Sequence, residues 1–158
     1  MSLKEQDIQE IYDKMKPLIG KRAWNIERTW GSFITFEIGH IVSVSEDVTR
    51  SEWLLSIRHC VWRLQTSDDV ICGSEDPHDH MDPALKRLEN LAFLAFEIFH
   101  PSLEMTISFE LGLFLRLFPI YTYEEDFEHV VLFTPDHHFL KLGPGSNWVY
   151  RRSDVPGR

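Results

Sequence analysis

The sequence predicts an α+β domain built mainly from antiparallel β-strands, arranged as a twisted sheet or a partly closed barrel. Apolar and polar residues alternate over most of the chain after residue 22, as in strands with one covered face. The connections between these runs are short, which favours antiparallel neighbours, because a parallel crossover needs about a dozen residues or more. Helical spacing is confined to the N-terminus and one short central segment. We expect about eight to ten strands.

The chain has the size of a single domain. Its 158 residues include 11 Phe, 5 Trp and 4 Tyr, which can fill a substantial core. We therefore predict one domain over residues 1–158. It divides into an N-terminal helix, a first β half, an acidic loop with a helix, a second β half and a tail, at residues 1–20, 21–73, 74–91, 92–150 and 151–158.

Two segments carry helix signals. Ser2 and Glu5 have the spacing of a capping box, and apolar residues follow three and four apart until Pro17 closes the pattern. In the middle of the chain, Asp82 is placed to cap a second helix, with Pro83 at its first position. We expect both helices to pack against the sheet.

The remaining apolar runs predict strands. One long strand is expected over residues 53–65, where both faces are mostly apolar, as in a central strand covered on both sides. The other predicted strands lie at residues 22–27, 34–38, 70–72, 93–99, 104–109, 113–119, 129–134 and 139–142.

A short sequence pattern occurs twice. Thr35–Gly39 (TFEIG) is echoed 73 positions later by Ser108–Gly112 (SFELG). Strands draw on the same few residue types, so chance is one explanation. The other is internal duplication of a strand–turn–strand unit, which predicts two similar halves that superpose over residues 22–65 and 93–119.

Three segments of the C-terminal third carry a resemblance to a known group of proteins. They are residues 115–121 (LRLFPIY), 132–136 (LFTPD) and 143–150 (GPGSNWVY), with a weaker match at Gly20–Trp24. Together they resemble a family of small bacterial proteins with no established activity. Some small bacterial proteins of this general kind are immunity proteins, which neutralise a toxin by binding it. The resemblance implies such a binding role as one function and carries no catalytic residue.

The charge balance favours a basic partner. With 25 acidic and 16 basic residues, the formal net charge is −9, and no Lys/Arg cluster is present that could bind nucleic acid or an anionic membrane. We expect a non-enzymatic module that docks a basic protein through its acidic loops. The expected partner-binding residues are Glu75, Asp76, Asp79, Glu124, Glu125, Asp126 and Glu128.

The alternative function is a metal- or small-ligand-dependent enzyme. His78 and His80 lie two apart in an acidic loop, and with Asp76 they offer the nitrogen and oxygen ligands that zinc and nickel accept. A solvated loop without metal explains the same residues, so we expect no cofactor. His137 and His138 form a weaker pair at a predicted hairpin tip, where adjacent side chains point apart.

The two cysteines are expected to be reduced thiols. The N-terminus has no apolar signal segment, and no apolar run reaches the length of a membrane helix, so we expect a cytoplasmic protein. Cys60 and Cys72 are then reduced, buried residues on neighbouring strands. His59 cannot activate Cys60, because adjacent strand residues point to opposite faces.

Three arginines lie within apolar strands, at positions 58, 63 and 116. A charge in such a place must be paired, or its head must reach water along an apolar stem. Two arrangements are open: cross-strand pairing with Glu37, Glu97 or Glu104, or a shallow anion pocket on the sheet.

Overall fold

The computed structural model describes residues 3–44 and 49–153. The helices of these residues are α1 (Leu3–Met15) and α2 (His78–Lys86), with two 3-10 turns, η1 (Lys16–Leu18) and η2 (Glu110–Gly112). Their strands are β1 (Ala23–Arg28), β2 (Ile34–Val44), β3 (Thr49–Ile57), β4 (Cys60–Gln65), β5 (Val70–Gly73), β6 (Phe93–Ile98), β7 (Met105–Phe109), β8 (Phe114–Pro119), β9 (Val130–Phe133), β10 (His138–Leu142) and β11 (Trp148–Arg152). Ser2 lies outside the described residues, so the capping box stays a prediction.

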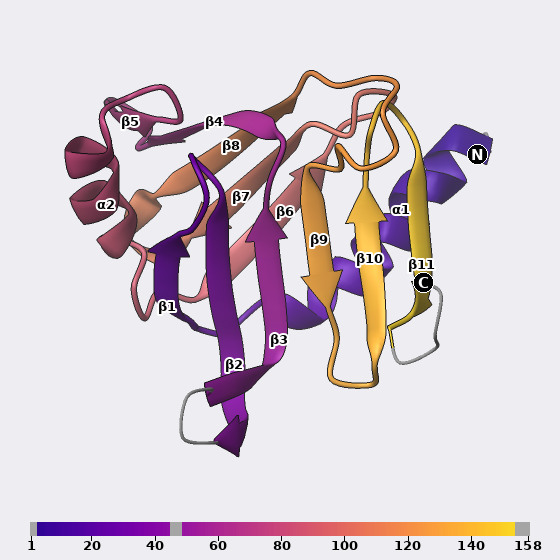
Figure 1. Ribbon diagram of the computed structural model, residues 1–158, viewed down its shortest axis with the longest axis horizontal. Helices are drawn as coiled ribbons and strands as arrows, with labels where there is room; N and C mark the ends of the chain where they lie inside the picture. The colour runs from indigo at the N-terminus through magenta and orange to yellow at the C-terminus, as the bar shows by residue number, and fades with distance from the viewer. Residues whose placement is uncertain (1–2, 45–48, 154–158) are drawn as a thin grey trace.

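The strands form two antiparallel sheets, ordered β1-β2-β3-β9-β10-β11 and β5-β4-β8-β7-β6. In Figure 1 the five-stranded sheet lies largely behind β1–β3, while α1 lies behind β9–β11. The predicted α+β fold, with antiparallel strands, an N-terminal helix and one central helix, is confirmed. The described strands divide between two open sheets, and no closed barrel forms among them.

The core lies between the sheets. Phe36 of β2 is fully buried, and its ring centroid lies 6.2 Å from those of Phe93 and Phe109 in the opposite sheet. Trp62 of β4 is also fully buried, and its Nε1 donates a 2.8 Å hydrogen bond to the carbonyl oxygen of Ser32 in the β1–β2 turn. Apolar burial therefore joins the two layers, and this polar bond fixes the turn against them.

α1 covers the part of the six-stranded sheet that the other sheet leaves open (Figure 1). Ile11 and Met15, which lie on its predicted apolar face, are fully buried. Lys14 Nζ lies 4.6 Å from the ring centroid of Tyr150 in β11, a cation–π contact. The helix ends at Met15, and Pro17 lies in the 3-10 turn that follows.

The predicted long strand over residues 53–65 is wrong. The chain turns at Arg58 and His59, so β3 belongs to one sheet and β4 to the other. Both faces of the run are apolar because Leu55 and Ile57 fill the core from the six-stranded sheet, and then even-numbered residues such as Trp62 fill it from the five-stranded sheet. The change of parity at residues 58–59 marks the crossing.

α2 begins at His78 instead of Pro83, so Asp82 lies inside the helix and does not cap it. The Asp82 carboxylate pairs with Nε of Arg28 in β1 at 2.7 Å. That hydrogen bond is the main cause of the lowered pKa of Asp82. The contact ties α2 to the edge of the six-stranded sheet.

Each sheet contains a three-stranded meander, β1-β2-β3 in one and β6-β7-β8 in the other. The two sequence echoes nevertheless occupy unlike positions. Ile38 is fully buried in β2, whereas the matched Leu111 is 82% exposed in η2 with φ of 64°. The buried triplets are Ile34, Phe36, Ile38 and Met105, Ile107, Phe109, which are 71 positions apart rather than 73. Duplication of the meander stays a prediction. If it is right, the two copies are related by an offset of 71 positions and not by the 73 of the repeated sequence pattern.

Candidate functional site

Three chain connections meet at one end of the sandwich (Figure 1): the β1–β2 turn, the β3–β4 turn and the long β8–β9 connection. They bring five aromatic rings together, which we call the aromatic patch. Its members are Trp30, Phe33, His59, Tyr121 and Phe127. Residues that are far apart in the sequence thus form one surface.

The rings of the aromatic patch contact one another in a continuous chain. Trp30 meets Phe33 edge-on at 5.5 Å between centroids, and Phe33 meets His59 at 4.9 Å. His59 stacks on Phe127 at 4.5 Å, and Phe127 meets Tyr121 at 4.6 Å. Distances and angles of this kind are favourable for aromatic pairs, so the rings hold one another in place.

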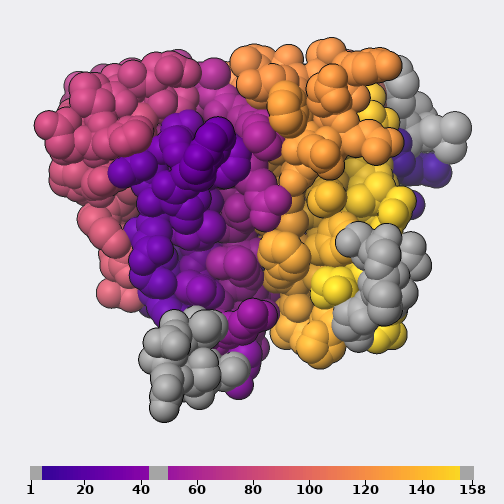
Figure 2. Space-filling view, viewed as in Figure 1, coloured from indigo at the N-terminus to yellow at the C-terminus, as the bar shows by residue number. Residues whose placement is uncertain are grey.

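Much of the patch faces solvent. Trp30 is 75% exposed and Tyr121 is 40% exposed. Ile120 and Tyr123, which flank Tyr121 in the sequence, are exposed as well. In Figure 2 the indigo β1–β2 turn and the orange segment around residue 120 lie close together on the viewed face. Large exposed aromatic patches are typical of surfaces that bind other molecules.

An ion pair anchors the β8–β9 connection beneath the patch. Glu128 is 4% exposed, and its Oε1 accepts a 2.9 Å hydrogen bond from Nη1 of Arg58. The same guanidinium donates through Nε to Ser56 Oγ at 3.0 Å. The carboxylate of Glu128 is thus enclosed and holds Arg58, and its contact with a partner stays a prediction.

The other acidic residues of this segment are exposed, as predicted. Glu124, Glu125 and Asp126 form a bend closed by a 3.0 Å hydrogen bond from the Phe127 amide to the Glu124 carbonyl. Phe127 then turns into the aromatic patch, so the three carboxylates stand at its margin. We call residues 124–126 the acidic bend.

The acidic bend also borders a hollow. This open hollow of about 490 Å³ lies over β10 and β11 and is lined by Glu125 and Asp126 together with Lys141 and Arg151. The two cations offset the carboxylates there. Positive charge therefore lies close to the carboxylates of the acidic bend at this hollow.

The second acidic segment lies at the opposite side of the molecule, around β5 and α2 (Figure 1). Glu75 and Asp79 are exposed. Asp76 is half-buried, and its Oδ2 accepts a 2.8 Å hydrogen bond from the amide of Gly73. The predicted partner-binding residues therefore form two separate surfaces, and only the acidic bend adjoins the aromatic patch.

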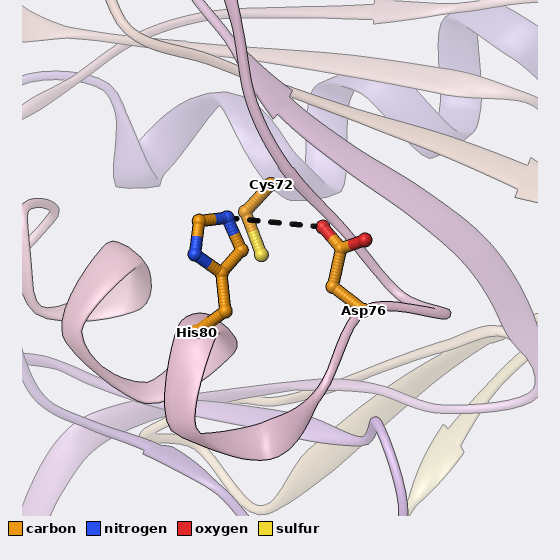
Figure 3. Close-up of side chains that lie close together, drawn as sticks. All are labelled: Cys72, Asp76 and His80. Carbon is orange, nitrogen blue, oxygen red and sulfur yellow. Dashed lines mark ion pairs between the residues drawn. The ribbon is translucent and has the colours of Figure 1, made fainter.

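The predicted metal ligands are only partly brought together. Figure 3 shows Asp76 and His80 beside Cys72, with His80 Nε2 and Asp76 Oδ2 4.0 Å apart. Among residues 3–44 and 49–153, these three side chains are the one group of metal-ligating type that converges. His78 is not in it, and its charge contributes instead to lowering the pKa of Asp82. Sequence reasoning missed Cys72 because a strand cysteine looks like a core residue.

The histidines near the β9–β10 hairpin do not converge. His138 stacks on Tyr150 at 4.9 Å between ring centroids, and its Nδ1 lies 3.1 Å from the Asp136 carbonyl oxygen. His137 has φ of 61°, a left-handed conformation that glycine adopts more readily than other residues.

Arg63 and Arg116 do not form the predicted cross-strand ion pairs. They are direct partners on β4 and β8, and both lie over the ring of Phe118, at 5.4 and 5.2 Å from its centroid. Within the described residues, neither has a carboxylate at ion-pair distance. The Phe118 ring takes the place of a counter-ion for both guanidinium groups.

Cys60 has no activating neighbour in the part of the chain that the structure describes. The His59 ring is taken up by the aromatic patch, and burial raises the pKa of the Cys60 thiol to about 12. The sulfur is therefore a protonated core atom at neutral pH.

The comparisons with known proteins gave no match: no family model, no curated protein and no solved structure is similar to this chain. None of the described helices combines the length and apolar character needed to cross a membrane.

Proposed function

We propose that this chain is a protein-binding module that recognises a basic protein through the aromatic patch and the acidic bend. The observation that carries the proposal is the assembly of five rings from three connections, with Trp30 75% exposed at one end. Solvent exposure of so large an aromatic side chain costs free energy, which a bound partner would recover.

Aromatic side chains dominate the energetics of protein interfaces. Trp and Tyr are enriched among the residues whose truncation costs most binding energy, because they bury large area and lose little side-chain entropy. Trp30 and Tyr121 fit this role, since both are exposed and both contact a further ring of the patch.

Charge selects the class of partner. The chain has a formal net charge of −9, and three of its carboxylates stand in the acidic bend beside the rings. A Lys or Arg side chain could stack on an exposed ring and pair with a carboxylate of the bend. Such complementarity increases the association rate and specificity.

The site is also held rigidly. The Arg58 amide donates to the His129 carbonyl at 3.0 Å, and the Arg58 side chain pairs with Glu128. At the other end of the connection, the Gly145 amide donates to the Tyr121 carbonyl at 2.9 Å. A surface fixed in this way loses little conformational entropy on binding. An immunity role, in which the basic partner is a toxin, is the specific form of this proposal that the sequence resemblance supports.

Capture from native lysate with substituted chains tests the proposal. We expect the wild-type chain to retain a basic protein that salt releases, and Trp30→Ala to weaken binding of the purified partner at least tenfold. Leu111→Ala is the matched control, because Leu111 is also large and exposed but lies in η2, outside the patch. Equal loss in both variants, or a partner that binds equally at high salt, would contradict the proposal.

A further inference from the structure

We propose that Cys72, Asp76 and His80 form a binding site for a divalent transition metal, with zinc as its occupant. The inference is independent of the aromatic patch, which lies elsewhere on the molecule. It also differs from the metal loop predicted from the sequence, because a strand cysteine takes the place of His78.

The three ligands come from adjoining elements. Cys72 lies on β5, Asp76 in the turn after it, and His80 in the first turn of α2. One ligand atom from each lies within 4.8 Å of the others, and in Figure 3 the three side chains surround a common space. Thiolate, imidazole and carboxylate are the three protein groups that zinc accepts.

The ligand atoms lie somewhat farther apart than in a tetrahedral site, with every pair within 4.8 Å. Zinc bonds of about 2.3 Å to sulfur and about 2.0–2.1 Å to nitrogen and oxygen place the ligand atoms roughly 3.3–3.6 Å apart. His80 Nε2 and Asp76 Oδ2 are 4.0 Å apart. The His80 side chain is 57% exposed, so it is free to move toward a bound metal.

Without metal, each of the three side chains makes a contact that metal binding would either replace or leave in place. Asp76 accepts from the Gly73 amide, and a carboxylate has further lone pairs for a metal. His80 Nε2 donates to the Ile71 carbonyl at 3.0 Å, and to bind zinc it exchanges this bond and carries its proton on Nδ1. Burial and then Asp76 keep the Cys72 thiol protonated, and the metal displaces that proton.

A metal at this site would link the edge strand β5 to the helix α2. β5 has four residues and forms the edge of its sheet, and α2 follows it directly. A metal held by Cys72 and His80 joins the strand to the helix. Three protein ligands leave a fourth position for water or for a small ligand.

Cobalt titration of the full chain tests the site, because a cobalt–thiolate bond gives a charge-transfer absorption that nitrogen and oxygen ligands do not. We expect a saturable band at one equivalent, displaced by zinc. Cys72→Ser should abolish the band, and His80→Gln should weaken cobalt binding at least tenfold.

His78→Gln and Cys60→Ser are the matched controls, the first in the same loop and the second at the other thiol. Both should leave the cobalt spectrum unchanged. Circular dichroism establishes that each variant is folded. No thiolate band in the folded wild-type chain, or a band that His78→Gln or Cys60→Ser removes, would overturn the proposal.

Discussion

His80 and His129 begin from the same contact and end in different roles. In each, Nε2 lies at hydrogen-bond distance from a backbone carbonyl oxygen. The partner of His80 is Ile71 at 3.0 Å, and the partner of His129 is Leu103 at 2.9 Å. The His80 side chain is 57% exposed beside a thiol and a carboxylate, whereas His129 is 1% exposed. The surroundings, more than the residue type, decide whether an imidazole is available for chemistry.

The enclosure of His129 explains its behaviour. Its Nδ1 is buried without a hydrogen-bond partner among the residues described, and the backbone of Gly143 lies against it. Burial lowers the pKa of His129 to about 4, because a charged ring would lose its hydration. His129 is therefore a neutral core residue, while His80 keeps access to solvent and to ligands.

The largest effect on stability is expected from a substitution that crowds the buried His129 ring. Gly143→Ala would place a Cβ 2.6 Å from His129 Nδ1 at a residue with φ of 89°. We expect it to lower the free energy of unfolding by roughly 2–5 kcal/mol, from backbone strain and overpacking together. Gly112→Ala separates the two causes, since Gly112 has φ of 68° but no atom within 4 Å of the new Cβ. Urea denaturation should show a clearly larger loss for Gly143→Ala, and equal losses would mean that the His129 contact is unimportant.

The second largest effect is the loss of stability at low pH that burial of His129 causes. The folded-state pKa of His129 is about 4 and its ordinary value is 6.5, so between these values the unfolded chain binds more protons. Its contribution to stability is complete above pH 6.5 and is lost as pH falls toward 4, by about 3 kcal/mol in total. Chemical denaturation between pH 7 and 4.5 measures this slope. His129→Gln keeps a donor for the Leu103 carbonyl and should flatten it, and an unchanged slope would assign the effect to other groups.

The smallest effect is expected at His80. Without metal, His80→Gln should change the free energy of unfolding by less than about 0.5 kcal/mol, as for other exposed side chains. With zinc present, the wild-type chain should melt at a higher temperature and the variant should not. Thermal melts with and without zinc measure both quantities. A large loss of stability in the metal-free variant would place His80 with His129 as a structural residue.

The sequence predicted most of the fold because alternation of apolar residues is a local signal. The strands at Phe93–Ile98, Met105–Phe109 and Phe114–Pro119 lie where the alternation places them. The alternation of apolar residues gave a wrong strand where the chain passes from one sheet to the other. The run through Arg58 and His59 was predicted as one strand, because the shift from odd to even buried positions is easily overlooked.

The site was harder to predict. Nothing local to Trp30 and Phe33 shows that they share one chain of rings with Tyr121 and Phe127, which are linked to them through His59. Glu128 looked like its acidic neighbours, since its burial depends on Arg58, 70 residues away along the chain. Cys72 and His80 come together only because α2 folds back along β5. Long-range pairing of this kind is absent from single-sequence patterns.

The chain crosses from one sheet to the other at β3–β4 and again at β8–β9, and both crossings contribute to the aromatic patch. His59 comes from the first crossing, Tyr121 and Phe127 from the second, and Trp30 from a turn within the six-stranded sheet. Sliding or separation of the layers would therefore scatter the rings. The aromatic patch exists as one surface only while the two sheets stay packed together. A partner bound to all of its rings would therefore also stabilise the packing of the sheets.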